Sequence, residues 1–209
     1  MLEDGGWVVL CNSYRDNTSP TDIDIYARLY TADGTARGAM FKVSPDESAV
    51  QYAARVFGLD NGGFVVTWHN EAGDNDVGAV MIRAFKADGS PNGKAFRVNK
   101  STEDWQGAPQ ITKLSNGLLT VPYQQAEFNQ RGNRTYSGSF VQIVSAHGRK
   151  LIGDPVSDPD NTENPFYGIW DIAGLTDNRL ITTGLINTGG GEGIVFAQVN
   201  KLTGSGFLS

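Results

Sequence analysis

The stretch LDNGGFVVTW at residues 59–68 joins a tight-turn signal to a run of strand-forming residues. Asn-Gly and Asp-Gly pairs flanked by β-branched and aromatic residues are strong signals of a β-hairpin. The run at residues 63–68 is apolar at successive positions, which is typical of a strand covered on both faces by neighbouring sheets. We therefore expect a buried β-strand directly after the turn.

The same pattern recurs along the chain. Residues 2–9 read LEDGGWVV, and weaker copies begin at Leu114 and Leu175, so the leading leucines are 57, 55 and 61 residues apart. Within the first two copies, Ala-Asp-Gly and then Phe-x-Val follow in the same order. The period predicts a single repeat domain over residues 1–209. Its units span approximately residues 2–50, 51–105, 106–165 and 166–209, the first and last being incomplete.

Each unit predicts four short antiparallel strands, and no window carries the uninterrupted apolar period of a helix. Successive four-stranded units of similar length are typical of a β-propeller. We therefore predict an all-β, propeller-like fold of about 3.5 to 4 blades, with a β-sandwich or a β-solenoid as the alternative. Incomplete end units leave unpaired strand edges, so we expect a closed ring, a homodimer formed through these units, or a truncated piece of a longer protein.

Charge and hydropathy exclude two classes of partner. The formal net charge is −6 and the basic residues are scattered, whereas nucleic-acid binding requires clustered Lys and Arg. No apolar run approaches the length of about 18 residues that a membrane helix needs, so we predict no membrane insertion. Cys11 is the only cysteine, which excludes an intrachain disulfide, and we expect it to be a small buried residue.

The sequence does not show a conventional catalytic constellation. His69 and His147 are the only histidines and occupy different slots of the repeat, so neither a nucleophile–base pair nor a zinc site is apparent. His69 is expected on the surface beside a loop. The recurring acids Asp33 and Asp88 are explained by turn chemistry. The prediction is therefore a non-enzymatic protein, and a glycan-active hydrolase that uses two carboxylates is an alternative.

Glycan binding is the most specific hypothesis, because sugars stack on aromatic rings while amides, carboxylates and guanidinium groups hold the hydroxyls. Trp105 lies in a polar segment and is the best exposed candidate, whereas Trp7 occupies the slot of Phe64 and is expected in the core. Arg28 and Arg83 share one repeat position with Gln142 and Gln198, for which the alternative is a hydrogen-bonding role toward the next blade. The candidate ligand-binding residues are Trp105, Asp104, Gln106, Trp68, His69, Asn70, Arg28, Arg83 and Trp170.

Calcium is the one cofactor that the sequence suggests. Two of the long loops between strands contain closely spaced oxygen ligands, which suit calcium, although polar loops have the same composition without a metal. The candidate ligands are Asp16, Asp22 and Asp24 in the first loop and Asp74 and Asp76 in the second.

The combined pattern DGGFVVTW, then YA..Y.ADG, then G..F.VN resembles tandem propeller-like repeats of very large secreted bacterial proteins of the adhesin or RTX type. The resemblance is good over residues 2–114 and fades beyond them. It implies an extracellular or cell-surface location and no catalytic residues. The chain lacks the Gly-Gly-x-Gly-x-Asp nonapeptide, so the resemblance does not add calcium sites.

Together these observations predict a non-enzymatic binding or adhesion module of a secreted or cell-surface bacterial protein, with a glycan or protein ligand at its surface. A structural spacer and a glycan-active hydrolase are the two alternatives.

Overall fold

The computed structural model describes the chain except for residues 15–21, 46–48, 73–77, 129–133, 158–165, 178, 188–192, 204–205 and 209. Every regular element of the described part is a β-strand. Among the described residues there is no helix that could span a membrane.

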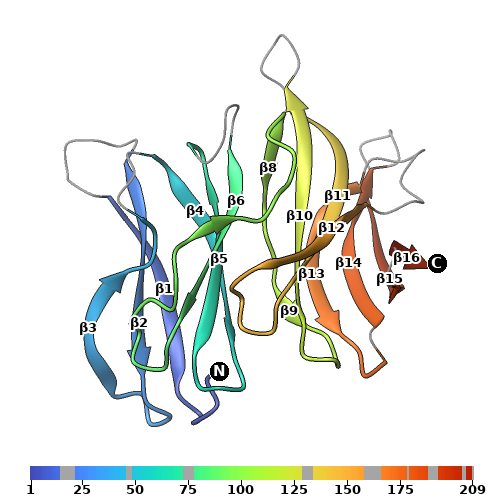
Figure 1. The fold of residues 1–209 in the computed structure, drawn as a ribbon. Coiled ribbons are helices and arrows are strands. Elements are labelled where there is room, and N and C mark those ends of the chain that lie inside the picture. The colour runs from blue at the N-terminus through green and yellow to red at the C-terminus, as the bar shows by residue number, and fades with distance from the viewer. Residues whose placement is uncertain are drawn as a thin grey trace.

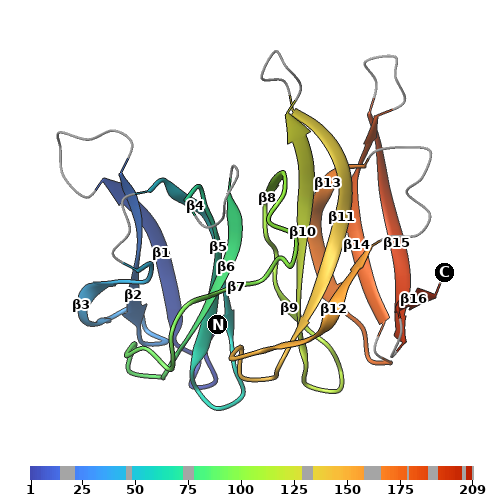
Figure 2. The ribbon, with the colours of Figure 1, turned by 45° about the horizontal axis from the view of Figure 1, so that its top comes forward.

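Four antiparallel sheets follow one another along the chain, and Figures 1 and 2 show them side by side. We call them blades 1 to 4. Blade 1 contains β1 (Trp7–Tyr14), β2 (Ile23–Tyr30) and β3 (Ala36–Lys42). Blade 2 contains β4 (Gln51–Gly58), β5 (Phe64–Asn70), β6 (Ala79–Phe85) and β7 (Phe96–Arg97).

Blade 3 contains β8 (Trp105–Gly107), β9 (Thr112–Lys113), β10 (Leu119–Phe128), β11 (Arg134–Val144) and β12 (Leu151–Ser157). Blade 4 contains β13 (Phe166–Gly174), β14 (Arg179–Asn187), β15 (Gly193–Thr203) and β16 (Gly206–Leu208). Within each blade the paired strands are neighbours in the sequence, except that β8 pairs with β10 although β9 lies between them in the chain. β9 also pairs with β10. The all-β, propeller-like prediction is confirmed, and blade 1 has three strands where blade 2 has four.

One turn recurs in all four units. The backbone N–H of Leu2, Leu59, Leu114 and Leu175 donates to the carbonyl four residues on, at 2.7, 2.8, 2.8 and 2.8 Å respectively. Gly62 adopts a φ of 77° inside this turn, which glycine tolerates without steric cost. The turn leads into the second strand of the unit and thereby fixes the register of the hairpin.

The core consists of side chains packed between consecutive blades. β5 is buried at every residue, as the sequence predicts, because blade 1 covers one of its faces and blade 3 covers the other. Phe64, Val66 and Trp68 belong to the cluster shared with blade 1, whereas Val65 belongs to the cluster shared with blade 3. Each such buried side chain stabilises the fold by about 1.5–3 kcal/mol relative to exposure.

Blade 1 exposes a face that blade 2 buries. Trp7 and Val9 are 44% and 41% exposed, although Phe64 and Val66, their equivalents in blade 2, are fully buried. Cys11 lies two residues after Val9 on the same face of β1 and is also exposed. The expectations that Trp7 lies in the core and that Cys11 is buried are therefore wrong, because no described residue covers this side of blade 1 as blade 1 covers blade 2.

Gly148 provides a test of the contact between blades 2 and 3. It has a φ of 63°, and a Cβ placed there would lie 2.1 Å from Cγ1 of Val65. We expect Gly148→Ala to lower the free energy of unfolding by roughly 2–4 kcal/mol, because the left-handed backbone and the overpacked core both cost energy. Urea unfolding followed by tryptophan fluorescence measures the change.

Gly117→Ala is the matched control. Its φ of 83° is similar, but a Cβ there meets nothing within 4 Å, so only the backbone cost of about 1–2 kcal/mol remains. Equal losses in the two variants would show that Gly148 does not report on packing between the blades.

Candidate functional site

Residues from blades 2 and 3 form an aromatic–histidine cluster of Tyr52, His69 and Trp105. The ring centroid of His69 lies 4.6 Å from that of Tyr52 and 5.3 Å from that of Trp105. Nδ1 of His69 is 2.8 Å from the carbonyl oxygen of Gln106. Because a carbonyl only accepts hydrogen bonds, this contact assigns a proton to Nδ1.

The cluster is buried, which corrects the sequence-based expectation. Trp105 is only 4% exposed, and Trp68 and His69 are fully buried, so none of them offers a ring face to a sugar. Trp105 belongs to β8, which pairs with β10, and its ring contacts His69 of blade 2, so it lies between the blades. Gly78 leaves room for this packing, because a Cβ there would lie 2.3 Å from Cε1 of His69.

Polar side chains around the cluster form hydrogen bonds with the backbone and with one another. The amide of Asn99 donates to Oε1 of Gln106 at 3.0 Å, while Oδ1 of Asn99 accepts from the backbone of Val80 at 2.8 Å. Asn70 is buried, and its Oδ1 accepts from the backbone of Ala72 at 3.0 Å. Gln106 and Asn70 are thus committed to internal contacts rather than displayed on the surface.

Strained backbone conformations occur in β4 and on both sides of β8. Ala53, Asp104 and Ala108 are the described non-glycine residues with positive φ, at 54°, 65° and 50°. Such residues cost about 1–3 kcal/mol each and concentrate at functional sites. Asp104 is half-buried, and its Oδ2 accepts from Nε2 of Gln125 at 3.1 Å. Asp104 is therefore a predicted ligand-binding residue that is partly accessible and has a strained backbone.

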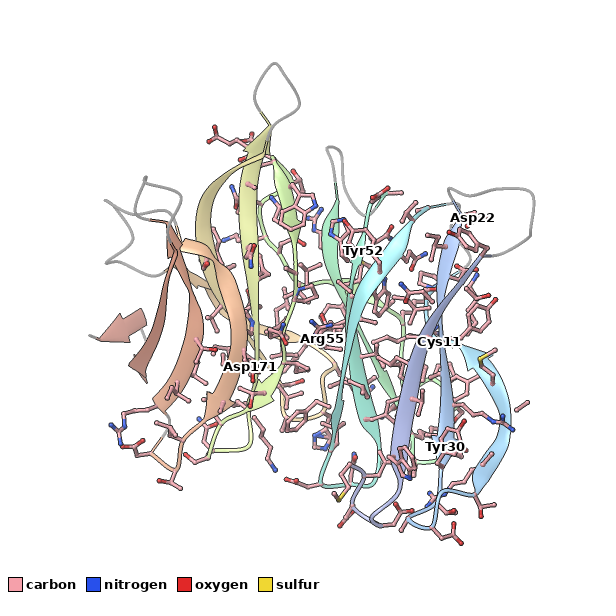
Figure 3. All side chains as sticks on the ribbon, turned by 180° about the vertical axis from the view of Figure 1, so that it is seen from behind. Cys11, Asp22, Tyr30, Tyr52, Arg55 and Asp171 are labelled. Carbon is pink, nitrogen blue, oxygen red and sulfur yellow. The ribbon has the colours of Figure 1, made fainter. Side chains whose placement is uncertain are left out.

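A second group, which we call the inner-strand row, consists of Arg55, Gln110 and Asp171. Each lies four residues before its unit's turn leucine: Leu59, Leu114 or Leu175. Nε of Arg55 donates to Oε1 of Gln110 at 3.1 Å. Arg55 and Asp171 are exposed, and Figure 3 shows both on the same side of the molecule, on β4 and β13.

Sequence reasoning missed the inner-strand row, although a signal for it was available. Aligning the units on their leucines places a cation, an amide and a carboxylate at one repeat position. The core positions of the same units keep their apolar character. A position whose chemistry changes from blade to blade is not required by the fold, so it is free to serve a site.

The described residues of the predicted arginine column donate hydrogen bonds to backbone carbonyls. Nη1 of Arg83 donates to the carbonyl of Val43 in blade 1 at 3.0 Å, which joins the two blades. Arg28, at the same position of blade 1, is exposed and donates to the carbonyl of Gly38 at 3.2 Å. Gln142 donates to the carbonyl of Ile152 at 3.2 Å. All three side chains donate to backbone carbonyls, and only the contact of Arg83 crosses to another blade. The side chains of Trp170 and Gln198 lie outside the described residues.

Two of the predicted calcium ligands, Asp22 and Asp24, belong to the described residues. Asp24 is fully buried, and its Oδ2 lies 2.7 Å from Nζ of Lys42, so a cation already neutralises this carboxylate. Asp22 is half-buried, whereas Asp16, Asp74 and Asp76 lie outside the described residues. In the described part of the chain, no three His, Cys, Asp or Glu side chains gather as metal ligands would.

The recurring turn acids are hydrogen-bonded within their turns. Oδ1 of Asp88 accepts from the backbone of Ser90 at 2.8 Å. Hydrogen bonds from the Ser90 hydroxyl and backbone lower the pKa of Asp88, and a hydrogen bond from the Thr31 hydroxyl lowers the pKa of Asp33. The turn interpretation of both residues agrees with these contacts.

Comparison with known proteins identifies similar folds. No family model matches the sequence, and the search of curated proteins found no significant match. An α-L-arabinanase from Penicillium chrysogenum, solved with arabinobiose, aligns with 91% of this chain and 59% of its own, at 15% identity and a TM-score of 0.54. An endo-arabinase from Bacteroides thetaiotaomicron aligns with 98% of this chain and 74% of its own, at 11% identity and a TM-score of 0.54.

A Hadza microbial sialidase aligns with 94% of this chain and 42% of its own, at 13% identity and a TM-score of 0.60. At these identities the likeness shows the fold. The chain spans 59% of the length of the arabinanase, so the activity of that whole enzyme is not thereby transferred.

The prediction of a non-enzymatic binding or adhesion module is contradicted by this comparison. The similar structures are arabinanases and α-L-arabinofuranosidases rather than adhesion modules. The error has a physical cause. The repeat pattern is dominated by turn and core residues, which any propeller needs, whereas a catalytic centre uses single residues that differ from blade to blade.

His69 provides a test of the cluster. We expect His69→Ala to lower the free energy of unfolding by roughly 2–4 kcal/mol, because it leaves a cavity between Tyr52 and Trp105 and removes the partner of the Gln106 carbonyl. Thermal and urea unfolding measure the loss. His69→Gln introduces the residue found at the equivalent position 124 and should recover part of it. A stability within about 0.5 kcal/mol of the unmodified protein for His69→Ala would contradict a structural role.

Proposed function

We propose that the protein is a glycoside hydrolase whose site lies on β4, on β13 and on the segment around β8 that runs from residue 104 to residue 110. The observation that carries the proposal is the inner-strand row, in which equivalent positions of three blades present Arg55, Gln110 and Asp171. Assembling different chemical groups from successive blades is how a repeated scaffold acquires a single site.

The chemistry of these groups suits a glycosidic bond. Hydrolysis uses a pair of carboxylates, one as acid and the other as base or nucleophile. Asp171 is exposed on β13, and the half-buried Asp104 precedes β8. We assign Asp171 as one member of the pair and Asp104 as the candidate for the other.

Arg55 supplies a cation that is held by two hydrogen bonds. Nη1 of Arg55 donates to the carbonyl of Ala54 at 3.1 Å, in addition to the bond from Nε to Gln110. Two fixed contacts lower the entropic cost of using the guanidinium to bind substrate oxygens. We assign Arg55 to substrate positioning.

The similar structures suggest which substrates to test first. They include an arabinanase with arabinobiose, an endo-arabinase, and an α-L-arabinofuranosidase from Lactobacillus brevis. An arabinofuranose-containing glycan is therefore the proposed substrate class, and a sialoside is the comparison substrate.

Hydrolysis of arabinan and of 4-nitrophenyl α-L-arabinofuranoside tests the proposal. We expect the purified protein to release reducing sugar or nitrophenol, and Asp171→Asn to lower kcat by at least roughly 100-fold, because the amide cannot transfer the proton or attack. Arg55→Gln should raise KM more than it lowers kcat.

The matched control is Asp177→Asn, which removes an exposed carboxylate of the same blade that pairs with Arg179 at 2.7 Å in a turn. It should leave kcat unchanged. Absence of hydrolysis with arabinan, the arabinofuranoside and a sialoside would overturn the proposal. So would equal kcat values for Asp171→Asn and the unmodified protein.

We also propose that a second copy of the chain covers the open face of blade 1, formed by Trp7, Val9, Cys11 and Met40. Met40 is 52% exposed and its sulfur lies 3.5 Å from that of Cys11. The equivalent face of blade 2 is covered by another blade of this chain, so the geometry suits a sheet as the occupant.

Light scattering measures whether such a dimer forms. We expect twice the mass of one chain and slow maleimide labelling of Cys11, because burial in the interface shields the thiol. Trp7→Ser combined with Val9→Thr should yield a monomer with rapid labelling, whereas Tyr14→Ser, an exposed change outside this face, should not. A monomeric unmodified protein would contradict the proposal.

A further inference from the structure

The seam between the outer strands of blades 2 and 3 contains two adjoining hollows, of about 380 and 400 Å3. Phe96 of β7 and Lys150 line the first hollow, whereas the next residues in the chain, Arg97 and Leu151, line the second. The residues that line the two hollows thus follow one another along both chain segments, and we call the two hollows together the outer groove. Figure 2 shows β7 and β12 on the same side of the molecule.

The outer groove is basic in a protein that is acidic overall. Five cations and one carboxylate line its described part: Lys94, Arg97, Lys100, Arg149, Lys150 and Asp154. The whole chain carries a formal net charge of −6, so the concentration of cations here opposes the average. Clustered like charges repel one another, and a bound anion relieves that repulsion.

The single carboxylate does not neutralise the groove. Asp154 pairs with Lys100 at 2.7 Å, and both side chains are largely exposed. An exposed ion pair contributes little to stability, so a competing carboxylate can exchange with Asp154 at low cost. Nε of Arg97 donates to the carbonyl of Asn99 at 3.1 Å, which holds this guanidinium at the groove.

The uncharged lining residues distinguish a sugar from other anions. Asn92 is half-buried and lines the first hollow, so an amide group accompanies the cations there. Phe96 is half-buried and adds an apolar surface. Amides suit hydroxyl groups, an aromatic side chain suits the apolar face of a sugar ring, and guanidinium or ammonium groups suit a carboxylate.

We propose that the outer groove binds a polysaccharide that carries carboxylate groups, such as a chain of uronic acid residues. Each hollow is within the size range of small-molecule sites, and two hollows with consecutive lining residues suit more than one unit of a chain. This site is separate from the inner-strand row, so it does not depend on the proposed hydrolase activity.

Calorimetric titration with oligogalacturonate tests the proposal. We expect binding that weakens as salt is added, and a loss of at least roughly tenfold in affinity for the triple variant Lys94→Gln, Arg149→Gln, Lys150→Gln, because charge-assisted contacts are removed. Neutral arabinan should bind equally to the unmodified protein and to the triple variant, or to neither of them. Asp171→Asn should retain the binding, which separates this result from the test of catalysis.

The matched control is the triple variant Lys86→Gln, Lys113→Gln, Arg179→Gln, which removes the same charge from positions outside the groove, of which Lys86 and Arg179 are exposed and Lys113 is half-buried. It should retain the affinity. Mass spectrometry of acetylated lysines gives a second readout in the unmodified protein, in which oligogalacturonate should protect Lys94 and Lys150 but not Lys86.

Three outcomes would overturn the proposal: no binding of oligogalacturonate at low salt, an equal loss in the control variant, or no protection of Lys94 and Lys150. Equal affinity for dextran sulfate or single-stranded DNA would also overturn it, because a general polyanion surface would then explain the binding.

Discussion

Burial of a sheet on both faces is the constraint on which the rest of this structure depends. β5 has no exposed residue, because blades 1 and 3 each cover one of its faces. A strand in this position needs apolar side chains at consecutive residues, and it needs neighbours of matching shape. The repeat satisfies both needs at once, since each blade supplies one face to the blade before it and another to the blade after it.

Stacking of the blades also determines where chemistry is available. Between the blades, polar groups such as Gln106 and Asn99 bond to one another because burial without a partner is costly. Along the inner strands and the outer seam, side chains lie at the margins of the stack and are released from packing. Arg55, Asp171 and the cations of the outer groove all occupy such margins. Both proposed sites therefore lie where the repeat places few demands on residue type.

The functional prediction from sequence was wrong for a related reason. The pattern that identifies the repeat contains the residues that every blade shares, and these are turn and core residues. Residues that make one blade differ from another are absent from such a pattern, and the inner-strand row was overlooked for this reason. The resemblance to repeats of secreted bacterial proteins, and the extracellular location that it implies, stay predictions.

The sequence by itself determined the local structure: the turn at each leading leucine, the strands that follow it, the period and the propeller-like class. The turns and strands depend on neighbours a few residues apart, as the hydrogen bond from Leu59 to Gly63 illustrates. Their recurrence along the chain gives the period and the propeller-like class. Only the tertiary structure decided exposure, which buried Trp105 and His69 and left Trp7 accessible. Exposure depends on which blade lies against a strand, and that contact joins residues far apart in the chain, so no local pattern records it.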